Sequence, residues 1–134
     1  MNRWTAGAIA LSLVSFPCLL PHVLEDFGLG IAQRVGLSTG VGAAMLGAGL
    51  AVQVLGLVLI GRGRRAGLVV TLVAGATWTA GAGWDHGPEL WRTGFGFRGS
   101  ALSALWVIGL ALGQSLAALF ALVALISDGS PGER

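Results

Sequence analysis

Four long apolar stretches dominate this sequence and limit the folds open to it. They run from about residue 4 to 22, from 40 to 60, from 66 to 84 and from 101 to 126. An α-helix rises 1.5 Å per residue, so about 20 residues are needed to cross a hydrocarbon core about 30 Å thick. The sequence therefore predicts an all-α integral membrane protein, a single domain whose four transmembrane helices form a compact bundle. Residues 127–134 are predicted to form a short solvated tail.

The composition agrees with a membrane location and excludes other classes. Charged residues make up 10% of the chain and apolar residues 54%, whereas soluble domains carry about 25% charged residues. The eight basic residues are dispersed arginines, so no nucleic-acid-binding surface is predicted. The single cysteine, Cys18, rules out an intrachain disulfide. Because no small-residue cleavage site follows the first apolar stretch, we expect that stretch to stay as a helix rather than to be removed as a signal peptide.

The arginines also predict how the chain is oriented. Arg62, Arg64 and Arg65 lie in a tight turn between the second and third stretches, and Arg3 lies near the N-terminus. Cytoplasmic loops carry an excess of arginine and lysine, so this turn and both termini are expected to be cytoplasmic. The two longer connections, residues 23–39 and 86–100, would then lie along the headgroup layer on the outer side. A prokaryotic-type cytoplasmic (inner) membrane is the expected location.

A weak similarity between the two halves indicates a tandem repeat of two-helix units. The two units would be related by a spacing of 64 residues and would have parallel orientations. The matching positions are His22 with His86, Glu25 with Glu89, Phe27 with Trp91, Gly30 with Gly94, and Arg34 with Arg98.

Small residues recur along the third and fourth stretches at the spacing of one helix face. The third stretch contains Gly67, Thr71, Gly75, Thr79 and Gly83, and the fourth contains Gly109 and Gly113 in a GxxxG arrangement. Such faces let helix backbones approach closely in lipid. We expect them to pack within the bundle or to bind other membrane subunits or a second copy, with membrane lipids covering the bulky faces. Gln53 and Gln114, inside two stretches, are expected to bond between helices.

Two polar clusters follow the first and third stretches. The first contains His22, Glu25 and Asp26, and the second contains Asp85, His86 and Glu89. Each histidine comes about 27–30 Å along the helix from the inner surface, so both are expected at the outer boundary and at nearly the same depth. The two histidines could therefore contribute to one shared site.

Three chemistries fit these clusters. The two histidines and the four acids could hold a transition metal through nitrogen and oxygen ligands. His22 and His86 could instead be the axial ligands of a b-type haem, or a histidine and a carboxylate could bind a quinol headgroup. The alternative is purely structural, with the polar groups paired to Arg34, Arg92 and Arg98 in a wet outer layer.

The residues next to the two histidines affect which side chains could form a shared site. His22 and Glu25 are three residues apart and can share one helix face. Gly87 and Pro88 disfavour a continuing helix, so Pro88 is expected to begin a new short helix. Cys18 lies one turn before His22, where it could add a soft ligand but is expected to be a packing residue.

No activity is predicted from a motif. The middle of each stretch lacks Asp, Glu, Lys, Arg and His, which disfavours a coupled transporter or proton pump, and no residue is nominated as a nucleophile. The sequence therefore favours a small accessory or stabilising subunit of a larger membrane complex, such as a respiratory or energy-converting one, without catalytic activity of its own. The alternatives are a metal- or haem-binding redox protein that uses His22 and His86, or a protein that binds a quinone or another small ligand.

Overall fold

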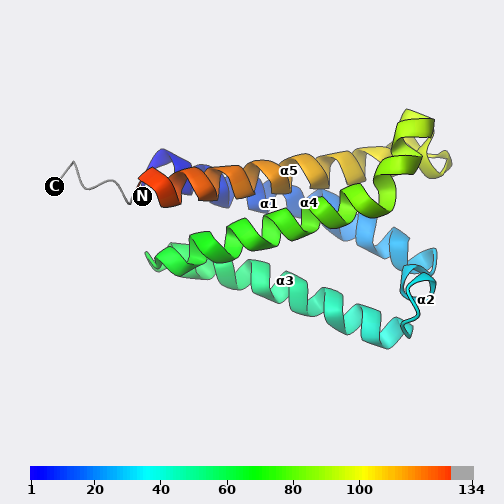
Figure 1. Ribbon diagram of the computed structural model, residues 1–134, viewed down its shortest axis with the longest axis horizontal. Helices are drawn as coiled ribbons and strands as arrows, with labels where there is room; N and C mark the ends of the chain where they lie inside the picture. Colours follow the sequence, from blue (N-terminus) through cyan, green and yellow to red (C-terminus); the bar gives the residue numbers. More distant parts are fainter. Residues whose placement is uncertain (128–134) are drawn as a thin grey trace.

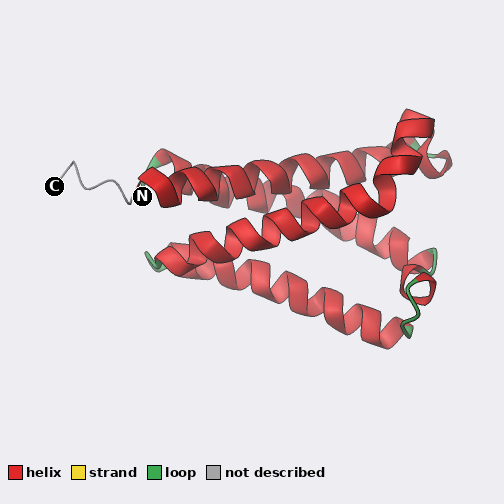
Figure 2. Ribbon diagram, in the orientation of Figure 1, coloured by secondary structure: helices red, strands yellow, loops and turns green. Residues whose placement is uncertain are grey.

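The structure, a computed structural model, describes residues 1–127, and this part of the chain contains helices and no β-strand. In chain order the elements are α1 (Arg3–Gly28), α2 (Ile31–Arg34), α3 (Thr39–Gly61), α4 (Arg65–Thr93), the 3-10 helix η1 (Gly94–Gly99) and α5 (Ala101–Ser127) (Figures 1 and 2). The helices α1, α3, α4 and α5 are long and apolar enough to cross a membrane, as predicted. Ser127 ends α5, and the rest of the predicted tail lies outside the described residues.

The four long helices do not pack equally. Helices α1, α4 and α5 form the closely packed part of the bundle, and α3 contacts mainly α4. Figure 1 shows α3 close to α4 at the turn that joins them and diverging from it toward α2. The start of α1 and the end of α5 lie at the same end of the bundle as that turn, while α2 and η1 lie at the other end. A hydrogen bond of 2.8 Å from the Arg65 guanidinium to the Leu125 carbonyl joins α4 to α5 at the first of these ends.

Two helices extend beyond the predicted spans and carry polar residues with them. Helix α1 continues past His22 to Gly28, and α4 continues past Trp84 to Thr93. The expectation that Pro88 begins a new helix is wrong, because Pro88 lies inside α4. A proline removes one backbone hydrogen bond and bends a helix without necessarily ending it. Figure 1 shows such a change of direction in the last turns of α4.

The small-residue faces pack inside the bundle. A Cβ added at Gly67 would lie 2.5 Å from the backbone nitrogen of Ile60 in α3, and one added at Gly75 would lie 2.7 Å from the Gln114 carbonyl in α5. A Cβ added at Gly113 would lie 2.9 Å from the Cβ of Ser15 in α1. These glycines let the backbones approach where any side chain would hold them apart. The predicted association with partner subunits through these faces stays a prediction, and the described packing already covers most of them.

Polar contacts add to the packing between helices. The Gln114 amide donates a hydrogen bond of 2.6 Å to the Ser15 hydroxyl, which joins α5 to α1 as expected for an intramembrane glutamine. Thr79 of α4 and Ser115 of α5 bring their hydroxyl oxygens to 3.1 Å. Gln53 is buried in α3, but its side-chain amide has no hydrogen-bond partner in the described part of the chain.

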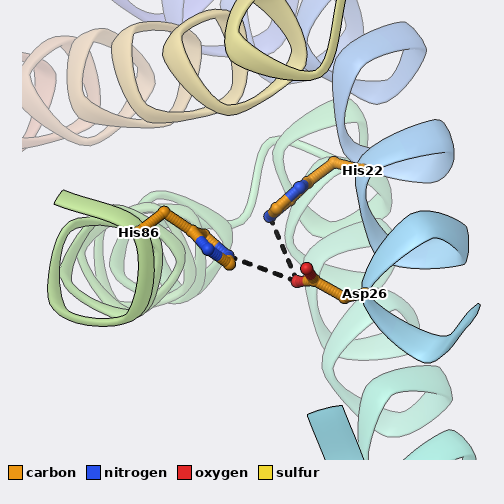
Figure 3. Close-up of side chains that lie close together, drawn as sticks. All are labelled: His22, Asp26 and His86. Atoms are coloured by element: carbon orange, nitrogen blue, oxygen red, sulfur yellow. Dashed lines mark ion pairs between the residues drawn. The ribbon is translucent and has the colours of Figure 1, made fainter. Parts of the chain in front are cut away.

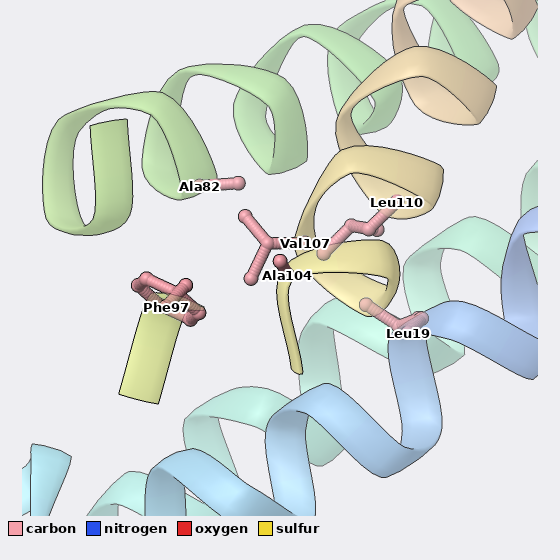
Figure 4. Close-up of a cluster of buried hydrophobic side chains, with 6 residues drawn as sticks. All are labelled: Leu19, Ala82, Phe97, Ala104, Val107 and Leu110. Atoms are coloured by element: carbon pink, nitrogen blue, oxygen red, sulfur yellow. The ribbon is translucent and has the colours of Figure 1, made fainter. Parts of the chain in front are cut away.

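A cluster of buried apolar side chains lies near the end of the bundle that carries η1. It joins α1, α4, η1 and α5 (Figure 4), through Leu19, Ala82, Phe97, Ala104, Val107 and Leu110. Phe97 is fully buried, so η1 folds its apolar side chain into the bundle instead of lying wholly along its surface. This packing holds the last turns of α1 and α4 against each other and positions the polar residues beside it.

Candidate metal centre

Three buried polar residues converge between α1 and α4. His22 and Asp26 come from α1, His86 comes from α4, and each is at most 9% exposed. The Nε2 atoms of both histidines lie 3.3 Å from the same oxygen, Oδ2 of Asp26. Figure 3 shows the two imidazoles pointing from opposite helices toward this carboxylate. The sequence predicts the two histidines at nearly the same depth and leaves their meeting open; in the structure their rings are in contact.

Helix periodicity explains why these residues meet. His22 and Asp26 are four residues apart on α1, a spacing that places side chains on the same face. His86 faces them because Ala82, one turn earlier on α4, is buried in the apolar cluster beside Leu19 and Leu110. The imidazoles contact each other edge to face, with ring centroids 4.6 Å apart, and Phe97 packs against the His86 ring at 5.7 Å.

Arg98, in η1, closes the cluster from the loop side. Its guanidinium lies 2.6 Å from Oδ1 of Asp26 and 3.1 Å from Oε2 of Glu25. The backbone of Arg98 has a φ of 52°, a left-handed conformation that non-glycine residues seldom adopt. Such a conformation costs about 1–3 kcal/mol and persists only where the surrounding structure holds it. Of the three arginines expected to pair with the acids, Arg98 does so, whereas no such pair involves Arg34 or Arg92 in the described residues.

The other predicted ligands take different positions. Glu25 binds Arg98 and accepts a hydrogen bond from the Ser103 hydroxyl of α5, so it joins three elements at the edge of the cluster. Oδ2 of Asp85 lies 3.3 Å from Nε2 of His86, but the Asp85 side chain is 38% exposed. Glu89 is half-buried and makes no side-chain ion pair or hydrogen bond with a described residue. Cys18 packs against Gly109 of α5 and against the apolar cluster that contains Leu19 and Leu110.

The hydrogen-bond directions define the tautomer of His86 in this arrangement. The Arg98 guanidinium lies 3.3 Å from Nδ1 of His86 and can only donate, so Nδ1 accepts. The proton of a neutral His86 ring is then on Nε2, which faces the carboxylates of Asp26 and Asp85. Nδ1 of His22 is buried and has no hydrogen-bond partner among the described residues.

The separations between Asp26 and the two histidines match those of a tetrahedral metal site. In a tetrahedral site with bonds of about 2.0–2.1 Å, two ligand atoms are about 3.3 Å apart. Both histidine nitrogens lie at 3.3 Å from Asp26 Oδ2, and the three potential ligand atoms all lie within 4.8 Å of one another. Arg98 holds the second oxygen of Asp26, in the manner of outer hydrogen bonds that orient metal ligands.

A haem fits this arrangement less well than a metal ion. Two axial histidines would lie on opposite faces of a porphyrin, whereas the rings of His22 and His86 are in direct contact. A haem between them would require α1 and α4 to separate.

A cavity of about 210 Å³ adjoins the cluster. Its lining includes His22, Asp26, Asp85 and His86 together with apolar residues such as Leu46 and Trp78. The cavity therefore lies against the imidazole and carboxylate side chains, while its accessible surface is almost entirely apolar.

Sequence reasoning missed two contributors to this site, Ser103 and Phe97. Both lie in or just after the connection that was expected at the surface, and neither forms a motif with the histidines. Phe97 reaches the cluster because η1 folds into the bundle, and Ser103 reaches Glu25 from the first turn of α5. Comparison of this chain with protein-family models, curated protein sequences and solved structures found no match. The chemistry of the cluster itself is therefore the basis for a functional proposal.

Proposed function

We propose that this protein binds one divalent transition-metal ion through His22, Asp26 and His86, at one end of its transmembrane bundle. The observation that carries the proposal is the shared 3.3 Å distance from Asp26 Oδ2 to the two histidine nitrogens. Two imidazoles and one carboxylate form a common ligand set for Zn²⁺ and Fe²⁺ in sites that keep an open coordination position. The adjoining cavity supplies space at that position.

The charges around the cluster support a cation. Glu25, Asp26 and Asp85 carry three carboxylates, and Arg98 is the one basic side chain paired with them among the described residues. The excess negative charge lies beside the two buried histidines. A divalent ion would balance it. An ion can bind Nε2 of His86 only if the ring proton moves to Nδ1. Nδ1 then no longer accepts from Arg98, so ion binding competes with that hydrogen bond.

The test is a metal titration of the purified protein in lipid nanodiscs. Co²⁺ serves as a spectroscopic probe and Zn²⁺ as its competitor. We expect one Co²⁺ per chain, with visible absorption bands that Zn²⁺ abolishes. His86→Ala and Asp26→Asn should each weaken binding at least about tenfold, because each removes one ligand. The matched control is Glu89→Gln, which changes a nearby carboxylate outside the cluster and should bind Co²⁺ as the unaltered protein does. Equal affinities for His86→Ala and Glu89→Gln would contradict the proposal.

The accessory-subunit role predicted from the sequence stays a prediction. Metal binding is preferred because it explains why two histidines and an aspartate are buried together, which packing against a partner subunit does not require. Purification from the native membrane tests the accessory role separately, because it requires other subunits at a constant ratio to this chain.

A further inference from the structure

A second, larger cavity lies between α3 and the rest of the bundle. Its volume is about 460 Å³, and its walls are almost entirely apolar, with Met45, Val52 and Val73 among the lining residues. It forms where α3 diverges from α4 (Figure 1). Phe27, Ile31, Leu46 and Trp78 line both this cavity and the smaller one beside the histidines. The two spaces are thus neighbours with almost entirely apolar surfaces, and the lining of the smaller one includes the histidines and carboxylates of the cluster.

We infer that these two cavities bind a lipid-soluble hydroquinone, with its hydroxyl-bearing ring beside His22 and His86 and its apolar tail between α3 and α4. Small-molecule sites are mostly apolar cavities of about 300–1,000 Å³ with a few polar groups that set the ligand's orientation. The polar end here offers a specific partner, because Nδ1 of His22 is buried, and it has no hydrogen-bond partner in the described part of the chain. Because this nitrogen has almost no accessible surface, a ligand hydroxyl can bond to it once the His22 ring turns toward the cavity.

The net negative charge of the cluster favours a ligand with a neutral headgroup over one with an anionic headgroup. Glu25, Asp26 and Asp85 outnumber Arg98, so a phosphate or carboxylate headgroup would be repelled. A neutral hydroxyl has no such cost and can donate to a carboxylate. Trp78, which lines both cavities, offers a flat aromatic surface to a ring. An aromatic diol on an alkyl tail satisfies the polar end, the aromatic wall and the apolar cleft together.

This inference concerns the same end of the bundle as the proposed metal site but does not depend on it. The cavity is lined by His22 and His86 whether or not an ion is bound. With an ion present, the ligand hydroxyl would occupy the open coordination position. Without one, it would bond to the side chains themselves.

The experiment measures binding of a decyl-substituted hydroquinone to the protein in nanodiscs under anaerobic conditions. Its dimethyl ether, which keeps the ring and tail but cannot donate, and oleate, which has a tail and an anionic head, are the comparison ligands. We expect the hydroquinone to bind at least about tenfold more tightly than either, because a hydrogen bond to a buried or charged partner is worth about that factor.

A matched pair of variants tests the position of the tail. A Cβ at Gly49 would lie 3.4 Å from the Trp78 ring and would enter the larger cavity, whereas nothing lies within 4 Å of one at Gly47, which is exposed on the same helix. Gly49→Leu should weaken hydroquinone binding at least about tenfold, and Gly47→Leu should leave it unchanged. Equal binding of the hydroquinone and its ether, or equal effects of the two variants, would overturn the inference.

The metal titration and the hydroquinone titration separate the two proposals. If the unaltered protein binds the hydroquinone selectively but binds no Co²⁺, the proposed metal function is excluded and this inference stands. Co²⁺ binding without selective hydroquinone binding would do the reverse.

Discussion

At the scale of single residues, Arg98 organises the charges of the buried cluster. It contacts Asp26, Glu25 and His86 at once, from a short helix that follows α4. Its guanidinium opposes a metal ion electrostatically while it orients the carboxylate that would bind that ion. Its left-handed backbone shows that the surrounding packing maintains this position against a local conformational cost.

Replacing Arg98 should therefore affect stability and metal binding in opposite directions. Arg98→Gln removes two ion pairs, and we expect it to destabilise the protein by about 2–4 kcal/mol, because two carboxylates lose their partner while Glu25 stays partly exposed. We also expect it to bind Co²⁺ several-fold more tightly, because a positive charge close to the ion is gone. Thermal unfolding and a Co²⁺ titration measure the two effects. Arg92→Gln, at an exposed position on α4, is the control. Weaker Co²⁺ binding by Arg98→Gln would show that Arg98 supports the site and does not compete with it.

At the scale of the helices, close backbone contact decides the arrangement of α4. Gly67 meets the backbone of α3, Gly75 meets that of α5, and Thr79 bonds to Ser115 of α5. The predicted face of small residues therefore serves two neighbours and not one continuous groove. Gly83, its last member, has open space where a side chain would be.

This difference predicts unequal effects of one substitution at two positions of the same face. Gly67→Ala places a Cβ 2.5 Å from a backbone atom of α3, which cannot rotate away. We expect a loss of about 1–3 kcal/mol of stability, typical of overpacking. Gly83→Ala, with nothing within 4 Å, should leave stability nearly unchanged. Thermal unfolding of both variants in the same detergent measures this. Equal midpoints would mean that α3 and α4 are not in close backbone contact at Gly67.

At the scale of the whole molecule, the two ends of the bundle differ in character. One end carries the Arg62–Arg65 turn and the start of α1, and the other carries α2, η1 and the buried cluster. Four membrane-spanning helices require these ends to face opposite sides of the membrane. The cytoplasmic position of the arginine turn stays a prediction from the positive-inside rule.

Labelling in intact cells tests this orientation. Gly61, at the end of α3, and Gly96, in η1, are both exposed, and a side chain added at either position meets no atom within 4 Å. We expect a membrane-impermeant maleimide to label Gly96→Cys from outside the cell, and Gly61→Cys only after the membrane is permeabilised. The unaltered chain, with Cys18 alone, gives the background. Labelling of both variants from the same side would contradict four membrane-spanning helices.

The predicted tandem repeat pairs residues of the two halves whose surroundings in the structure can be compared. His22 and His86 do meet, but the positions paired with them differ in their surroundings. Glu25 binds Arg98 and Ser103, whereas Glu89 makes no such contact in the described residues, and Arg98 is bound while Arg34 is exposed. The helix pairs differ too, because α4 packs closely on α5 and α1 scarcely touches α3. The repeat stays a prediction.

The sequence by itself determined the helical membrane fold and the two histidine clusters, because both depend on local composition and on distance along a helix. Apolar length sets where a chain can cross lipid, and 1.5 Å per residue sets how far a side chain is carried. Only the tertiary structure decided which acid lies between the imidazoles and which arginine balances it. Those choices depend on the continuation of α4 through Pro88 and on the burial of Phe97, which draws Arg98 to the cluster. Contacts between distant residues require the packing of several helices at once, and no local pattern records that packing.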